Sequence, residues 1–163
     1  MNPRNLKRRA VIGLIGTASA AALFLPSRGA SRPMVFRVTH SPAEWRQLLG
    51  AQRYAVLREA ATERPFSSPL LKEHRKGIFT CAGCALPLFS STTKFESGTG
   101  WPSFWRPLAG AVVTRPDRSL LAERTEVLCA RCGGHLGHVF DDGPKPTGLR
   151  YCMNGLALNF RPA

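Results

Sequence analysis

Cysteine carries the clearest chemical signal in this sequence. Four of the five cysteines form two Cys-x-x-Cys pairs, Cys81 with Cys84 and Cys129 with Cys132. Each pair follows a strand-like run and lies in a turn of small residues, which points two thiolates at one metal ion. Two such turns together supply the four ligands of a tetrahedral zinc site. The spacing therefore predicts one structural Zn²⁺ held by these four cysteines.

Other interpretations of the pairs start from the same spacing. The pairs could act as redox dithiols, although a second, similar motif would then need its own explanation and neither pair opens an obvious helix. They could form disulfides in an oxidising compartment. A mixed site is a third alternative, because His135 and His138 follow Cys132 closely.

Cys152 stands apart from both pairs. A lone cysteine is most often a small buried hydrophobic residue. Here Arg150 lies two residues before it, and His135 and His138 stand shortly upstream. Cationic neighbours stabilise the thiolate, which is the nucleophilic form of cysteine. The sequence therefore favours Cys152 as a nucleophile, with the two histidines available for proton transfer or substrate contact.

The elements that must position these residues are small helices followed by short strands. Residues 41–44 have the pattern of a capping box, and a second helical stretch is predicted over residues 51–61. Eight short runs broken by glycine and proline are typical of strands: residues 77–81, 86–90, 111–114, 119–122, 125–129, 137–140, 149–152 and 156–160. This order predicts a mainly β (α+β) domain with antiparallel strands and small N-terminal helices.

The N-terminus has the pattern of a targeting signal. Residues 1–9 are basic, and residues 10–25 form an uncharged run of 16 residues, shorter than the roughly 20 that a membrane-spanning helix needs. Arg8 and Arg9 before this run resemble a twin-arginine export signal. We therefore expect an export signal over 1–30, a connector over 31–40 and the domain over 41–163, in a periplasmic protein without a stable span in its mature chain. The alternative is an uncleaved N-terminal anchor.

The formal net charge of +13 raises a different class of function. A basic zinc ribbon that binds nucleic acid would combine this charge with Cys-x-x-Cys pairs. Five of the positive charges lie in residues 1–30, however, and this interpretation leaves Cys152 and the histidines unexplained. A zinc-stabilised binding protein without catalysis is a further alternative, against which the same residues argue. Nucleic acid is accordingly not expected as a partner.

Three blocks of the sequence resemble a known family. SGTGWPSF (97–104), HLGHVFDDGP (135–144) and RYCMN (150–154) are similar, in that order, to the signature blocks of methionine-R-sulfoxide reductases. The resemblance extends over residues 44–160 and includes both cysteine pairs. Weaker similarity lies at TERPF (62–66) and KFE (94–96).

The resemblance implies two antiparallel β-sheets with peripheral helices and assigns a role to each site residue. Cys152 matches the catalytic cysteine that attacks the sulfoxide of oxidised methionine in peptides and proteins. The polar residues around the sulfoxide oxygen would be His135, His138 and Asn154. The substrate-binding residues would be Trp101, which receives the methyl group, Phe104 and Arg150.

One position departs from many relatives. They carry a resolving cysteine where this chain has Thr99. With four cysteines on zinc, no obvious thiol is left to form an internal disulfide with Cys152. We therefore expect a sulfenic acid at Cys152 that an external, thioredoxin-like dithiol reduces directly.

Overall fold

The computed structural model describes residues 34–119 and 123–163. Residues 34–163 form one compact unit. The predicted export signal over 1–30, the first residues of the connector and most of the predicted strand over 119–122 lie outside the described residues. Among the described residues, no helix has both the length and the hydrophobicity that a membrane span requires.

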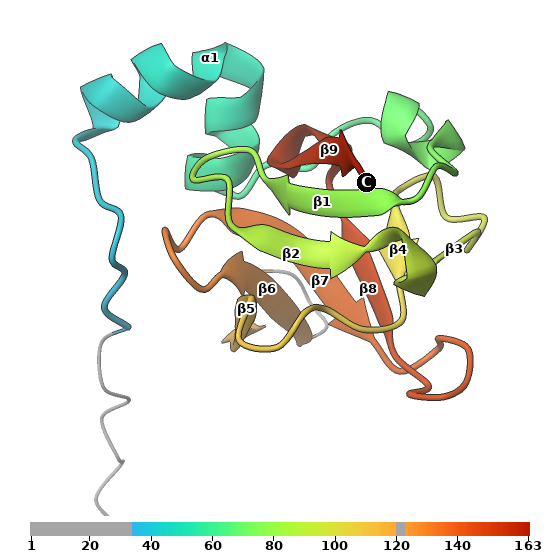
Figure 1. The fold of residues 1–163 in the computed structure, drawn as a ribbon. Helices are drawn as coiled ribbons and strands as arrows, with labels where there is room; N and C mark the ends of the chain where they lie inside the picture. Colours follow the sequence, from blue (N-terminus) through green and yellow to red (C-terminus); the bar gives the residue numbers. More distant parts are fainter. Residues whose placement is uncertain (1–33, 120–122) are drawn as a thin grey trace, which may run out of the picture. The chain divides into compact units, whose positions relative to one another are not determined.

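The helical part confirms the predicted cap and the predicted two stretches. Helix α1 (Pro42–Glu59) begins after Ser41, whose hydroxyl accepts the Glu44 N–H while the Glu44 carboxylate accepts the Ser41 N–H at 2.7 Å. Gly50 has φ 69° and ψ 169°, so it divides α1 into two segments with a sharp bend (Figure 1). A glycine suits this position because other residues rarely adopt a positive φ.

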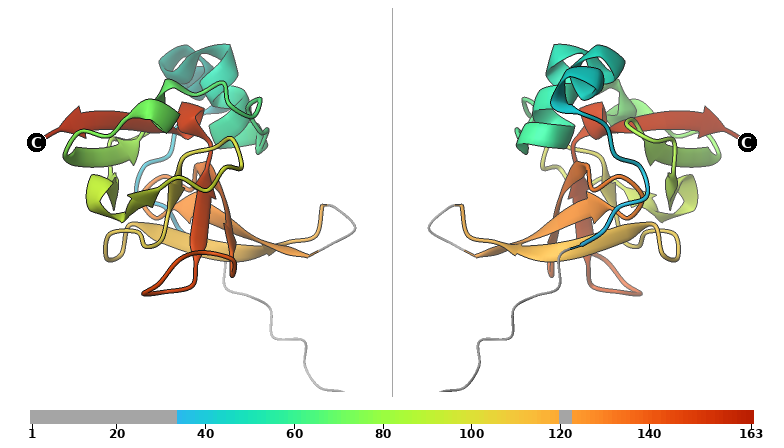
Figure 2. Two further views of the ribbon diagram at one scale, coloured as in Figure 1. Left: turned by 90° about the vertical axis from the view of Figure 1, so that its right-hand side faces the viewer. Right: turned by 90° about the vertical axis from the view of Figure 1, so that its left-hand side faces the viewer.

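The strands form two antiparallel sheets. The smaller sheet has the order β2 (Pro87–Ser90), β1 (Gly77–Cys81), β9 (Leu158–Pro162). The larger sheet has the order β3 (Lys94–Phe95), β4 (Ser103–Phe104), β8 (Arg150–Met153), β7 (His135–Phe140), β6 (Arg124–Cys129), β5 (Val112–Asp117). Three short 3₁₀ helices complete the described elements: η1 (Pro69–Lys72), η2 (Ser91–Thr93) and η3 (Gly155–Ala157). Figure 2 shows α1 and the smaller sheet on the same side of the larger sheet.

The predicted fold class is confirmed, with differences in short elements. The two-residue strands β3 and β4 were not predicted, because β3 pairs only with β4, and β4 pairs with β8, which lies far away in sequence. The last predicted strand was expected to begin at residue 156. In the structure residues 155–157 form η3, and the strand begins only at Leu158, where pairing with Cys81 starts.

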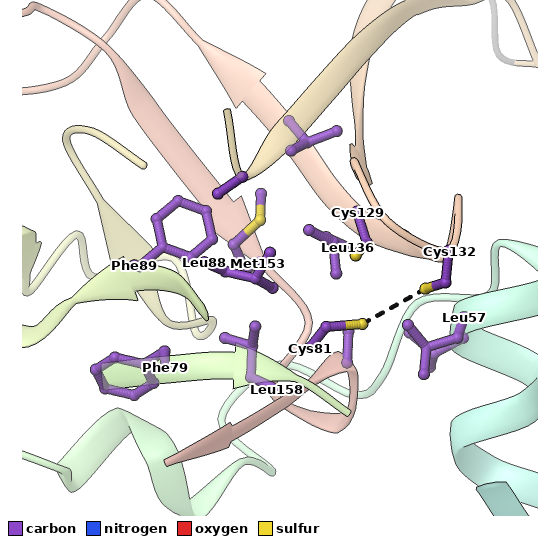
Figure 3. Packing of buried hydrophobic residues seen from close by; sticks show 14 of the residues in the cluster. Leu57, Phe79, Cys81, Leu88, Phe89, Cys129, Cys132, Leu136, Met153 and Leu158 are labelled. Carbon is purple, nitrogen blue, oxygen red and sulfur yellow. Dashed lines mark hydrogen bonds between the residues drawn. The ribbon is translucent and has the colours of Figure 1, made fainter. Parts of the chain in front are cut away.

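The hydrophobic core lies between the two sheets. Phe79 of β1, Phe89 of β2 and Phe104 of β4 are fully buried, and the ring centroid of Phe104 lies 4.9 Å from that of Phe79 and 4.4 Å from that of Phe89. Met153 and Leu158 pack beside them (Figure 3). At one end of this core the Cys81 and Cys132 sulfurs point toward each other beside Leu57 of α1 (Figure 3). The core thus joins the cysteine cluster to the strand that carries Cys152.

Candidate active site and metal centre

The two Cys-x-x-Cys pairs meet in space as predicted. Their four sulfur atoms lie within 4.8 Å of one another, and no other group of His, Cys, Asp and Glu side chains able to hold a metal occurs among the described residues. Cys81 Sγ is 3.7 Å from Cys132 Sγ, and Cys84 Sγ is 3.5 Å from Cys129 Sγ. Zn–S bonds of about 2.3 Å place the sulfurs of a tetrahedral site about 3.8 Å apart. The cluster therefore fits a metal ion of this size.

The disulfide and mixed-ligand interpretations do not fit this geometry. A disulfide requires sulfurs about 2.05 Å apart, and all five cysteines are free thiols. Neighbouring sulfurs, above all those of Cys129 and Cys132, and then burial raise the pKa of Cys81. A bound cation is the group that holds such a crowded quartet as thiolates. No histidine belongs to the described cluster, which leaves His135 and His138 for other roles.

Cys152 belongs to a row of residues that crosses the larger sheet. Ser103 of β4 pairs with Cys152 of β8, Cys152 pairs with His138 of β7, and His138 pairs with Glu126 of β6. Residues directly opposite in antiparallel strands share a face, with Cβ atoms about 5 Å apart. The sheet therefore places a thiol beside an imidazole on one surface, while Met153, the next residue along β8, is fully buried in the core.

A small pocket of about 120 Å³ opens beside this thiol. Its walls bring together four of the predicted site residues, Trp101, His138, Cys152 and Asn154. The remaining wall residues are Thr62, Arg124, Gly137 and Phe140. An indole, a thiol, an imidazole and an amide thus face one space.

Gly137 is required between the two histidines. Its φ is 155°, and a Cβ there would lie 2.1 Å from the backbone oxygen of Cys152. The missing side chain lets β7 approach β8 closely enough for His138 to stand opposite Cys152.

A β-bulge brings the two histidine rings together. His135 and His138 are three residues apart, which would place them on opposite faces of a regular strand. The pairing of β6 with β7 shifts between Val127 and Leu128, so one residue of β7 is extra. Both rings therefore lie on one side, with centroids 5.4 Å apart.

Each histidine is held by its own carboxylate. The Nδ1 atom of His135 lies 2.7 Å from Glu126 Oε1, and the Nε2 atom of His138 lies 2.7 Å from Asp117 Oδ2. Burial lowers the pKa of His138; Asp117 opposes this effect, and the positive charge of Arg124 adds to it. Burial alone would raise the pKa of Glu126, but hydrogen bonds from His135 and Arg115 outweigh burial and lower it. The net effect of these groups is a pKa of His138 below its ordinary value.

His135 is more deeply buried than His138. Its exposed fraction is 4%, and its Nε2 is buried without a hydrogen-bond partner in the described part of the chain. It lies behind His138 and is not a wall residue of the pocket. A direct role of His135 in proton transfer stays a prediction.

Glu63 positions two walls of the pocket, and its only signal in the sequence is the weak similarity of the TERPF block. Its backbone carbonyl accepts the Trp101 indole N–H at 3.2 Å, and its backbone N–H donates to Asn154 Oδ1 at 3.0 Å. Its buried carboxylate accepts the N–H groups of Gly155 and Leu156 at 2.5 and 2.9 Å. One residue thus connects the indole wall to the amide wall.

Arg150 lies on the same strand as Cys152, two residues away. Its guanidinium forms two 2.8 Å hydrogen bonds with Asp142 and lies 4.4 Å from the ring centroid of Phe140, a wall of the pocket. Hydrogen bonds with Asp142 first, and then the charge of nearby Cys152, raise the pKa of Arg150 despite its burial. Arg150 therefore packs against Phe140, which is itself a wall of the pocket.

Phe104 is not brought to the pocket. It was predicted to bind substrate, but it is fully buried between Phe79 and Phe89. Ser103 faces Cys152, and side chains alternate along a strand, so Phe104 must face the core. The structure makes it a core residue.

The chain matches a family model described as SelR domain over residues 49–162. It belongs to the SelR domain family. Three relatives are each named peptide methionine sulfoxide reductase MsrB, and each alignment covers most of both chains. The one from Methanosarcina barkeri (strain Fusaro / DSM 804) is 54% identical over 125 residues, 76% of this chain and 88% of its own. The one from Leptospira interrogans (serovar Lai, strain 56601) is 50% identical over 129 residues, 78% and 98% of the two chains.

A third relative comes from Bradyrhizobium diazoefficiens and is 55% identical over 127 residues, 77% of this chain and 91% of its own. These matches confirm the resemblance to methionine-R-sulfoxide reductases. Membership in the SelR domain family favours an enzyme over a nucleic-acid-binding zinc ribbon.

Proposed function

We propose that this SelR domain reduces the R epimer of methionine sulfoxide in peptides and proteins, with Cys152 as the nucleophile. The observation that carries the proposal is the separation of the sulfurs. Four lie in one cluster able to hold a metal, whereas Cys152 lines a pocket with an indole, an imidazole and an amide. The names of the relatives supply the reaction, the reduction of peptide methionine sulfoxide.

The first step transfers one oxygen atom. The Cys152 thiolate attacks the sulfoxide sulfur, and the sulfoxide oxygen takes up a proton as electron density moves onto it. The oxygen then passes to Cys152 as the S–O bond of the substrate breaks, which gives methionine and a sulfenic acid at Cys152. His138 is the proton donor in this scheme, because it stands directly opposite Cys152.

Trp101 and Asn154 would orient the substrate. The indole is an apolar surface for the sulfoxide methyl group, and the Asn154 amide and His138 lie on the polar side of the same pocket. Only one epimer then places its methyl on the indole and its oxygen on the polar groups at once. This arrangement would select the R epimer by shape.

An external dithiol completes the cycle. Its first thiol attacks the sulfenic sulfur of Cys152 and releases water, forming a mixed disulfide. Its second thiol breaks that disulfide, which returns Cys152 and leaves the dithiol oxidised. The chain's other four cysteines lie in the cluster, and Thr99 stands beside Cys152. We therefore infer a thioredoxin-like reductant.

We further propose that the metal in the cysteine cluster is Zn²⁺ and that its role is structural. Cys81 and Cys84 belong to the smaller sheet's turn, and Cys129 and Cys132 to the turn between β6 and β7. Four thiolates leave no ligand position open for substrate. When bound, the ion supplies cross-linking and charge neutralisation for these turns.

Export through a twin-arginine pathway remains a proposal from residues 1–30. Replacing Arg8 and Arg9 by lysine is expected to retain the protein in the cytoplasm, measured by cell fractionation of a tagged full-length chain. Unchanged export by this variant would refute a twin-arginine signal.

The activity is tested with peptides that carry either methionine-R-sulfoxide or methionine-S-sulfoxide, with dithiothreitol as reductant. The wild type is expected to consume only the R epimer, and Cys152→Ser to consume neither while keeping its metal. Trp101→Ala should lower kcat/KM, whereas the matched Trp105→Ala, outside the pocket, should not. Consumption of both epimers, or activity in Cys152→Ser, would refute the proposed mechanism.

A further inference from the structure

A groove adjoins the candidate active site on the far side of Trp101. It has a volume of about 720 Å³, within the range of ligand sites, and runs between residues 66–74 and 96–101. Trp101 lines both this groove and the pocket of Cys152. A polypeptide substrate with one side chain against the Trp101 indole, beside Cys152, can therefore extend into the groove along the protein surface.

Phe66 stands at this groove with an unusual backbone. Its φ is 62°, and its side chain is 69% exposed. Among the large hydrophobic residues that are exposed in the described part of the chain, Phe66 is the one with an aromatic ring. Its N–H donates to the Gly100 carbonyl at 2.8 Å. At Gly100, φ is 95° and a Cβ would come within 2.8 Å of Pro65, so only glycine permits this close approach. The backbone thus holds an apolar ring in solvent at a fixed place.

The charge of the groove is positive. Glu96 is its acidic wall residue, and the Lys94 ammonium group lies 2.8 Å from the Glu96 carboxylate. The same ammonium group donates to the Leu71 carbonyl at 2.8 Å, which ties the two walls together. Lys72, also a wall residue, is exposed and has no ion-pair partner among the described residues. An acidic ligand side chain would complement Lys72.

We propose that this groove binds the segment of an oxidised protein next to its methionine sulfoxide, and that it favours an acidic residue in that segment. Phe66 contacts the segment, and Lys72 pairs with its carboxylate. This inference rests on the proposed function, because the methionine sulfoxide must occupy the pocket of Cys152. The residues that select the flanking sequence would then lie outside the pocket in which the reaction takes place.

The test compares three R-sulfoxide substrates with dithiothreitol as reductant. The first is N-acetyl-methionine sulfoxide N-methylamide, which has no flanking residues. The others are matched peptides with aspartate or asparagine on both sides of the sulfoxide. The wild type should show a kcat/KM about two- to fivefold higher for the aspartate peptide than for the asparagine peptide, the range of an exposed ion pair. High salt should remove this preference.

Two variants locate the effect, each with a control. Lys72→Gln should abolish the preference for aspartate, whereas Lys145→Gln, an exposed lysine outside the groove, should keep it. Phe66→Ala should lower kcat/KM for both peptides about three- to tenfold, whereas Leu48→Ala, an exposed residue of α1, should not. Neither groove variant should change turnover of the blocked amino acid.

The outcomes separate this inference from the proposed function. No turnover of any of the three substrates by the wild type would refute the function itself. Normal turnover without any preference among the peptides, or with the same preference in Lys72→Gln, would refute the groove alone. An effect of Phe66→Ala or Lys72→Gln that appears only with a protein dithiol, and not with dithiothreitol, would assign the groove to the reductant and overturn the proposal.

Discussion

The hydroxyl oxygen of Thr99 lies 3.7 Å from the Sγ of Cys152. Thr99 in turn contacts Ser97, whose hydroxyl lies 2.7 Å from that of Ser103. A chain of hydroxyl groups therefore ends at the Cys152 thiol. A hydroxyl group cannot form a disulfide, so the proposed sulfenic acid at Cys152 would need an external reductant.

Replacing Thr99 by cysteine should change how the enzyme is regenerated. The new sulfur would lie beside Cys152, and it should attack the sulfenic acid and form an internal disulfide within one turnover. Mass spectrometry of the non-reduced protein should show this bond only after exposure to substrate. Thr92→Cys in η2, away from the pocket, is the control and should give none. A Thr99→Cys enzyme that stays in the sulfenic form would contradict the assigned proximity.

The pKa of His138 should rise when Arg124 is replaced by glutamine. Arg124 acts twice, because its charge lowers the pKa of His138 directly and its guanidinium, 2.7 Å from Asp117, competes for the carboxylate that raises it. Imidazole NMR titration measures the shift, and the window of activity that needs the imidazolium should extend to higher pH. Arg118→Gln on the same hairpin, whose guanidinium pairs with Glu123, should leave the His138 titration unchanged. A lowered pKa in Arg124→Gln would refute this electrostatic account.

Stability should depend on pH through Glu126. Its pKa is lowered in the folded chain, so its contribution is fully present above the unfolded value near 4.5 and is lost as pH falls through the lower folded value. Glu126→Gln should cost about 1.5–3 kcal/mol of unfolding free energy at pH 7, the range for a hydrogen bond to a charged group. This difference between variant and wild type should shrink on acidification below pH 4.5. Urea unfolding at several pH values measures it, and a difference that grows in acid would have the wrong sign.

Loss of one cluster cysteine should remove the metal and weaken the fold. Cys81→Ser deletes a buried ligand, and metal binding contributes directly to folding free energy, so the variant should lose several kcal/mol together with its metal. A strong chelator at elevated temperature should act in the same way on the wild type. Metal analysis and thermal unfolding measure both effects. Cys152→Ser is the matched control, and loss of metal from it would show that Cys152 is a ligand.

The cysteine chemistry was predictable from sequence because its signal is local. Two Cys-x-x-Cys turns predict a four-sulfur site without knowledge of how the fold brings them together. The strand over 77–81 likewise has the same bounds in the structure as in the prediction. The capping box before α1 is equally local. Such features need no knowledge of distant partners.

The supports of the site were not predictable, because they depend on pairing between distant strands. Asp117 and Glu126 have no local signature, and only the register of the β5–β6–β7 sheet aims them at His138 and His135. Phe104 belongs to a signature block but faces the core, since sequence does not show which face an alternating strand turns inward.

A single turnover without reductant should show whether Cys152 alone takes the oxygen from the sulfoxide. One equivalent of R-sulfoxide peptide should yield one methionine per chain, together with a sulfenic acid on Cys152, detected as the adduct of a sulfenic-acid reagent on the tryptic peptide that contains Cys152. The four cluster cysteines should stay unmodified. Methionine formed without modification of Cys152, or oxygen found on a cluster cysteine instead, would refute Cys152 as the nucleophile.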